Sequence, residues 1–200
     1  MSWGRDPAEA SRQLFTVADG QAGYFTAGQA REAGYSYPLQ HFHIRRGNWL
    51  RAGRNLYRLR EYPSSLHEEF VRWTFWSLSR GVISHQSALD FHRLGDYVSD
   101  RVHLTVPQGF RKRHGDVALH RAAIAPGDLE KHQGFRVTVP TRTILDCADS
   151  DLDPDRFEDT VRQALVSGRV RRKRLLDGLP GLSIRGRRRL SEALEKVPAA

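Results

Sequence analysis

The residues with the clearest capacity for chemistry are nine histidines and one cysteine, Cys147. His41 and His43 stand two positions apart, and His85 and His92 stand seven apart, but no HExxH, paired-cysteine or EF-hand spacing accompanies them. A single cysteine excludes an intramolecular disulfide and a multi-cysteine zinc site. We therefore expect no catalytic residue, no metal site, no cofactor and no enzymatic activity. We interpret Cys147 as a small buried hydrophobic side chain.

Two other groupings fall short of recognisable sites. Ser84 precedes His85, but no motif orients the imidazole as a general base. Aspartates at positions 149, 151, 153 and 155 resemble a calcium loop that lacks its glycine and its terminal glutamate. Neither grouping predicts catalysis or metal binding.

Positive charge is concentrated between Tyr35 and Leu59, a stretch without Asp or Glu. A solvated structural surface usually mixes both signs of charge, whereas phosphate binding favours one sign, because neutralised phosphates release counterions. The stretch therefore predicts a nucleic-acid-binding surface; the alternative is a small structural helical domain whose surface is basic. The basic side chains are His41, His43, Arg45, Arg46, Arg51, Arg54 and Arg58.

The elements that must hold these side chains are a helix, a turn, a second helix and a two-stranded ribbon. Thr26 and Gln29 predict a capping box at the start of the first helix. The second helix is expected from Ser36 to about Arg46, and Gly53 marks a hairpin turn. This order is that of a winged helix-turn-helix. In that motif the second helix can enter the major groove while the hairpin contacts the backbone or minor groove.

Both the second helix and the hairpin are expected to contact DNA. Gln can pair with adenine and Arg with guanine in the major groove, and other basic side chains bind the backbone. The sequence does not decide which face of this helix is buried, because Leu39 and Phe42 lie on one side and Ile44 lies roughly opposite. Packing inside the domain is an alternative role for Tyr37. For the histidines the alternative is a position that is merely solvated at the surface, and this is the favoured role for His43. The predicted DNA-binding residues are Thr26, Tyr37, Gln40, His41, Arg45, Arg46, Arg51, Arg54 and Asn55.

We expect an α+β fold with two domains: a winged helix-turn-helix domain at residues 1–62 and a mixed α/β domain at residues 63–200. Period-two alternation predicts strands at 101–107, 117–121 and 134–139 of the second domain. The remainder of that domain reads mainly as helices, and the last of them are basic. The predicted core of the first domain consists of Leu14, Phe15, Phe25, Ala30, Trp49, Leu56 and Tyr57.

The net charge of +9 is unevenly distributed. Residues 1–62 hold nine basic and five acidic groups, whereas residues 168–200 hold ten basic and three acidic groups. Such basic segments attract polyanions. No apolar signal core and no run long enough to span a membrane is visible, and a lone cysteine is consistent with a reducing compartment. We therefore expect a cytoplasmic protein without a membrane partner.

Five segments, in this order, resemble the AbiEi-type antitoxins of type IV toxin–antitoxin pairs. They are QAGYFTAGQAREAGYS, HIRRGNWLRAGRNLYRLREYPSS, VISHQSALDFHRLGD, RVHLTVPQ and VTVPTRTILDCA, and together they cover about residues 10–150. The resemblance implies a winged-helix DNA-binding domain followed by an α/β antitoxin domain. It also implies repression of the protein's own operon, operator DNA as a partner, and a nucleotidyltransferase-like toxin that is opposed directly or indirectly. Two copies are expected to pair on repeated half-sites.

The basic C-terminal segment admits three interpretations. It can add phosphate contacts, dock on an acidic toxin surface, or form a solvated helix face. The residues concerned are Arg171, Arg172, Lys173, Arg187, Arg188 and Arg189.

Two other functions compete with the antitoxin. Some chains with a similar front half continue into a Vsr-like endonuclease domain, but only about fifty residues follow Ala148 here, too few for such a site. A transcriptional regulator without a toxin partner is the second alternative.

Overall fold

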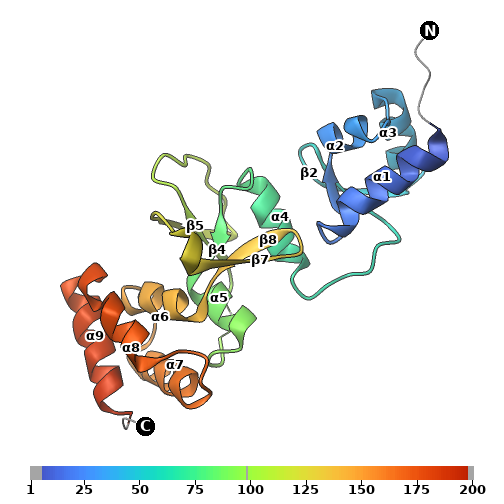
Figure 1. Ribbon diagram of the computed structural model, residues 1–200. Coiled ribbons are helices and arrows are strands. Elements are labelled where there is room, and N and C mark those ends of the chain that lie inside the picture. The colour runs from blue at the N-terminus through green and yellow to red at the C-terminus, as the bar shows by residue number, and fades with distance from the viewer. Residues whose placement is uncertain (1–5, 98, 198–200) are drawn as a thin grey trace. The chain divides into compact units, whose positions relative to one another are not determined.

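The computed structural model describes residues 6–97 and 99–197 and shows an α+β fold with two β-sheets. The chain divides into two compact units (Figure 1). The first unit contains the chain up to Ser79 together with Lys131–Phe135, and the second contains Arg80–Glu130 and the chain from Arg136 onward. The segment that follows residue 62, up to Ser79, is thus grouped with the first unit.

The first unit combines helices with a small antiparallel sheet. Its elements are α1 (Pro7–Asp19), β1 (Tyr24–Thr26), α2 (Ala27–Glu32), α3 (Tyr37–Arg45), β2 (Trp49–Gly53), β3 (Leu56–Leu59) and α4 (Glu68–Trp76). The strand order is β1-β3-β2, so the short strand before α2 pairs with the second strand of the hairpin. The predicted helix, turn, helix and ribbon are therefore present in the predicted order.

Local sequence signals account for the boundaries of these elements. The hydroxyl of Thr26 accepts a hydrogen bond from the backbone N–H of Gln29 at 3.2 Å, and the Gln29 side chain accepts from the Thr26 N–H at 2.9 Å. This is the predicted capping box, which satisfies two N–H groups that a helix start leaves unpaired. At the hairpin turn Asn55 adopts a φ of 58°, a left-handed conformation that Asn tolerates better than most residues.

The core of the first unit lies between the sheet and helices α1 to α3. Six of the seven predicted core residues are buried, and Phe15 is the exception, with 54% of its surface exposed. Helix α1 turns Leu14 and Ala18 inward, and Phe15 falls outside that stripe. Helix α3 adds Ile44 at the edge of the core and buries Gln40. The buried face of α3 is therefore the side that carries Ile44, and Leu39 and Phe42 face solvent.

The second unit combines most of a five-stranded mixed sheet with a group of helices. Its elements are β4 (Val82–Ile83), α5 (His85–His92), β5 (Val102–Val106), β6 (Val117–Arg121), η1 (Pro126–Asp128), β7 (Leu129–His132), β8 (Phe135–Thr138), α6 (Pro140–Ala148), α7 (Pro154–Val166), α8 (Arg172–Gly178), η2 (Leu179–Gly181) and α9 (Ile184–Glu195). The strand order is β6-β5-β4-β8-β7. Strand β4 is antiparallel to β5 and parallel to β8, and β5 is parallel to β6.

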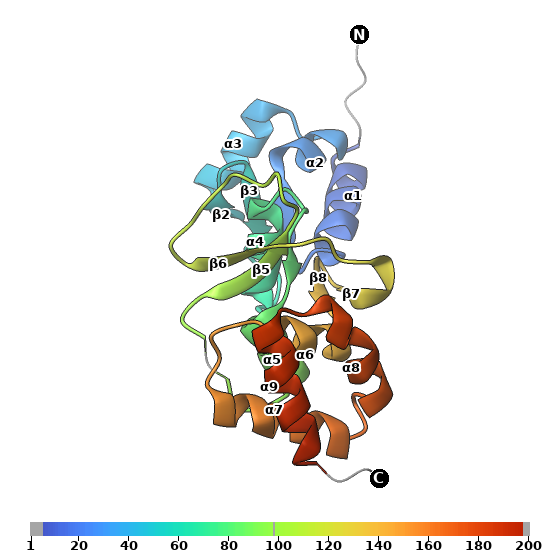
Figure 2. The same cartoon turned by 90° about the vertical axis from the view of Figure 1, so that its left-hand side faces the viewer.

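Helices α5 to α9 are grouped together in the second unit (Figure 2). They bury a second core that contains Cys147. Helix α9 packs against both α6 and α7. Burial raises the pKa of the Cys147 thiol well above its usual range, so this side chain is an inert packing residue, as predicted. Among the described residues no helix is long and apolar enough to cross a membrane.

Candidate nucleic-acid interface

The outward face of α3 carries two arginines and a histidine beside two apolar side chains. His41, Arg45 and Arg46 are all exposed, and Phe42 and Leu39 expose 43% and 40% of their surfaces. The guanidinium of Arg46 lies over the Phe42 ring at 5.5 Å from its centroid. Sequence reasoning identified the basic residues of this face but not its apolar component, because Leu39 and Phe42 were equally suited to the core.

The arginines of this surface are available to an outside partner. Arg45, Arg46, Arg51 and Arg54 are exposed, and none forms a salt bridge within residues 6–97 and 99–197. Each guanidinium can therefore bind a phosphate or a base edge without first breaking an ion pair inside the protein.

The hairpin adds charge to the side of the sheet on which α3 packs. Arg51 pairs with Tyr57 across the strands, and Trp49 lies two residues earlier on the same face, because side chains alternate along a strand. Trp49 and Tyr57 belong to the core shared with the helices. Arg51 therefore projects from the helical side of the sheet, and Arg54 and Asn55 are exposed at its turn.

The backbone groups of a single residue, Ala27, link the hairpin turn to both helices of the motif. Its N–H donates to the carbonyl of Asn55 at 3.1 Å, and its carbonyl accepts from the side chain of Gln40 at 3.1 Å. Helix α3, the start of α2 and the hairpin turn thus meet at one place. We refer to the surface formed by Tyr37, His41, Arg45, Arg46, Arg51, Arg54 and Asn55 as the basic face.

Two predicted DNA-binding residues are committed inside the protein. Gln40 is only 3% exposed, and its amide nitrogen donates to the carbonyls of Ala27 and Tyr35. The hydroxyl of Thr26 is occupied by the capping box with Gln29. The prediction that Gln40 and Thr26 contact DNA is therefore wrong. Their side chains form hydrogen bonds with backbone groups of the first unit instead.

Two further basic residues of the same stretch are structural. The His43 ring stacks on Trp49 with centroids 5.0 Å apart, and burial lowers the pKa of His43. Arg58 is buried, donates to the carbonyls of Tyr62 and Pro63, and lies 3.4 Å from the carboxylate of Glu68. Arg58 therefore ties β3 to the segment that follows it.

The basic C-terminal segment divides into structural and free side chains. Arg172 donates to the carbonyls of Leu194 and Val197, and Arg189 donates to the carbonyls of Ser150, Leu152 and Asp153. The prediction that these two arginines contact DNA or a toxin is therefore wrong, because their guanidinium groups stabilise loops and helix ends. Of the other four, Arg187 donates to the carbonyl of Leu182, Arg188 lies 3.6 Å from Glu192, and Arg171 and Lys173 are exposed.

The second unit brings together three histidines that are distant in the sequence. The rings of His85 and His120 stack with centroids 3.4 Å apart, and His103 Nδ1 lies 3.0 Å from His120 Nε2. Within the described part of the chain, no group of His, Cys, Asp or Glu side chains is arranged to hold a metal ion. Each of the three imidazoles has its pKa lowered, first of all by burial, to about 2 for His85 and about 4 for His120. All three are therefore neutral at pH 7.

Ser84 is fully buried beside this cluster. It accepts a hydrogen bond from the Thr105 hydroxyl at 2.8 Å and lies 2.9 Å from His85 Nδ1. A buried hydroxyl cannot reach a substrate, so this arrangement acts as a polar network within the second unit rather than as a nucleophile and its base.

Comparisons with known proteins bear on the fold alone. No family model and no curated protein matches the chain. Three chains of solved structures match. They include the RV2827C protein from Mycobacterium tuberculosis, with a TM-score of 0.63 and 14% sequence identity over 96% of this chain and 78% of that one. At such low identity the likeness shows a shared fold and does not assign a function.

Proposed function

We propose that this protein binds double-stranded DNA through the basic face and acts as an antitoxin that represses its own operon. The observation that carries DNA binding is the basic face itself: four exposed arginines without internal ion pairs, held on α3 and a hairpin that Ala27 joins. The order α1-β1-α2-α3-β2-β3, with strand order β1-β3-β2, supports a winged helix-turn-helix in which α3 enters the major groove.

The antitoxin role rests on the sequence resemblance to AbiEi-type antitoxins. In this proposal a nucleotidyltransferase-like toxin is encoded by the adjacent gene, and the second unit opposes it directly or indirectly. The exposed residues Arg171 and Lys173 supply positive charge that suits either DNA or an acidic protein surface.

DNA binding is tested by gel shift on the region upstream of the protein's own gene, over a range of salt concentrations. We expect Arg45→Ala to weaken specific binding by about 1–3 kcal/mol and to relax base preference, as loss of a bidentate base contact would. We expect Arg54→Ala to weaken binding to all sequences alike and to reduce the salt dependence, because a phosphate contact releases counterions.

Arg12→Ala is the matched control, since Arg12 is an exposed arginine on α1 outside the basic face. Arg12→Ala should leave the gel shift almost unchanged, because it only lowers the net charge of the protein by one. If Arg45→Ala and Arg54→Ala both bind like the unaltered protein, α3 and the hairpin do not contact DNA.

The antitoxin role is tested separately, by expressing the product of the adjacent gene with and without this protein. The proposal is supported if the adjacent gene product arrests growth and this protein relieves the arrest. If the adjacent gene encodes no nucleotidyltransferase, the protein is a transcriptional regulator without a toxin partner. A nucleic-acid-processing enzyme, the other alternative, would cleave DNA or RNA in the presence of a divalent metal.

A further inference from the structure

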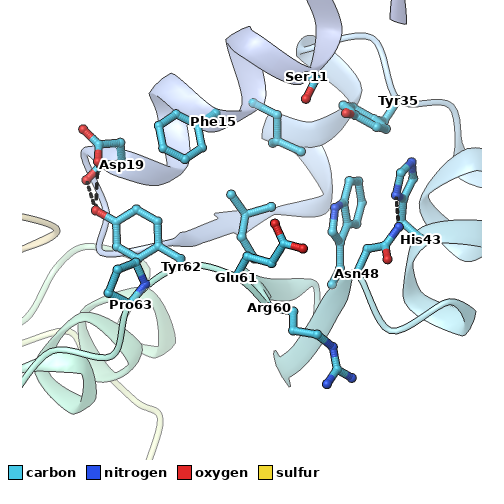
Figure 3. Close-up of a pocket in the computed structure, with 13 residues that line it drawn as sticks. Ser11, Phe15, Asp19, Tyr35, His43, Asn48, Arg60, Glu61, Tyr62 and Pro63 are labelled. Carbon is cyan, nitrogen blue, oxygen red and sulfur yellow. Dashed lines mark hydrogen bonds between the residues drawn. The ribbon is translucent and has the colours of Figure 1, made fainter. Parts of the chain in front are cut away.

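A pocket of about 730 Å³ lies within the first unit (Figure 3), and no residue of the basic face lines it. Its walls are α1, the end of α3 with the start of β2, and the segment that follows β3. The volume falls in the range of pockets that take small molecules, and the mixed polar and apolar walls include five aromatic side chains. The aromatic residues are Phe15, Tyr35, His43, Trp49 and Tyr62.

Two buried aromatic residues of the pocket retain unused hydrogen-bond donors. Tyr35 and Trp49 are 7% and 3% exposed, yet neither the Tyr35 hydroxyl nor the Trp49 indole N–H has a hydrogen-bond partner in the described part of the chain. Neither atom belongs to the fully buried polar atoms that lack a partner, so both groups are accessible to solvent. Their polar atoms are therefore free to bind a molecule in the pocket.

One exposed carboxylate among the lining side chains has no partner in the part of the protein that the structure describes. Figure 3 shows the Glu61 carboxylate turned toward the middle of the lining side chains, and Glu61 has no ion pair or hydrogen bond within residues 6–97 and 99–197. Asp19, the other carboxylate among the lining residues, accepts a hydrogen bond from the Tyr62 hydroxyl at 2.9 Å. The guanidinium of Arg60 is directed away from the other side chains and donates to the carbonyl of Gly47.

We propose that this pocket binds a small organic cation with a flat apolar body. An ammonium group would lie near the Glu61 carboxylate, and the faces of the surrounding aromatic rings would add cation–π attraction. The Tyr35 hydroxyl and the Trp49 indole N–H can donate to a polar substituent on the body of the ligand. An organic anion is disfavoured, because both unpaired and paired carboxylates of the pocket would repel it.

The test uses benzyltrimethylammonium as the cation, with benzyl alcohol and phenylacetate as neutral and anionic probes of similar shape. Each is titrated into the protein in the absence of DNA, and the Trp49 indole N–H signal is followed by NMR. We expect saturable binding of the cation at millimolar concentration and at least tenfold weaker binding of phenylacetate. Glu61→Gln should weaken cation binding about tenfold and leave benzyl alcohol binding unchanged.

Glu195→Gln is the control for overall charge, because Glu195 is an exposed carboxylate of the second unit. It should bind all three probes like the unaltered protein. Equal binding of the three probes, an unmoved Trp49 signal, or an unchanged cation affinity in Glu61→Gln would each overturn the proposal. Because no DNA is present, these results are independent of whether the basic face binds a duplex.

Discussion

The side-chain amide of Gln40 donates hydrogen bonds to two backbone carbonyls. Its side chain lies inside the first unit and bridges the start of α2 to the turn before α3. His41 is the next residue in the sequence, and its side chain is exposed. Neighbouring positions on one helix thus have opposite roles, since a step of about 100° per residue carries one side chain inward and the next toward solvent.

We expect Gln40→Ala to lower the free energy of unfolding by about 1–3 kcal/mol, because two buried carbonyls lose their donor. The folded fraction should bind operator DNA as the unaltered protein does. His41→Ala should do the reverse, with unfolding unchanged within about 0.5 kcal/mol and weaker DNA binding. Urea denaturation and gel shift distinguish the two variants. A loss of DNA affinity in fully folded Gln40→Ala protein would restore Gln40 to the interface.

At the scale of elements, three histidines join α5, β5 and β6. His85 begins α5 with a left-handed φ of 50°, and its ring covers that of His120 on β6, while His103 on β5 contacts the same ring. The strained backbone at His85 is offset by this packing. The cluster requires neutral imidazoles, because burial disfavours their charged form.

Stability is expected to fall with acidity because of this cluster. The folded-state pKa of His120, about 4, lies below its ordinary value of 6.5, so the unfolded chain takes up protons first as pH drops. The stabilising contribution is complete above about pH 6.5 and is lost as pH falls toward 4, by up to about 3 kcal/mol for this histidine.

Urea unfolding at pH 7 and pH 4.5 checks the acid sensitivity. His120→Gln should reduce the difference between the two pH values, whereas His41→Gln, at an exposed position, should not. The same difference in His120→Gln and in the unaltered protein would mean that other groups cause the acid sensitivity.

At the scale of the whole molecule, a net charge of +9 overstates the charge that is free to attract a partner. Arg58, Arg172 and Arg189 donate to backbone carbonyls inside the fold. Arg189 also lies over the Phe157 ring at 4.5 Å. Long basic side chains can thus stabilise loops as well as bind polyanions, and composition does not separate the two uses.

We expect Arg189→Ala to lower the free energy of unfolding by about 3 kcal/mol, since three carbonyls lose a charged donor. The combined variant Arg171→Ala, Lys173→Ala and Arg174→Ala removes three exposed charges and should change unfolding by no more than about 0.5 kcal/mol. Thermal and urea unfolding measure both. Comparable losses in the two proteins would show that the exposed basic residues also stabilise the fold.

The sequence by itself determined the features that depend on neighbouring residues. The capping box of Thr26 and Gln29 and the order of helices and strands in the first unit follow from local hydrogen bonds and backbone preferences. The hairpin was also predicted, but Gly53 ends β2, and the left-handed residue of the turn is Asn55. The concentration of arginines between residues 45 and 54 was also visible, because charge is a property of composition.

Tertiary structure alone decided which side of α3 is buried and what each polar side chain contacts. Leu39, Phe42 and Ile44 are similar in hydrophobicity, so only packing against Trp49 and the other core residues could select Ile44. The contacts of Arg189 with the loop after α6, and of His85 with His120, join residues more than thirty positions apart. Such contacts are set by how the elements pack, and no local pattern encodes them.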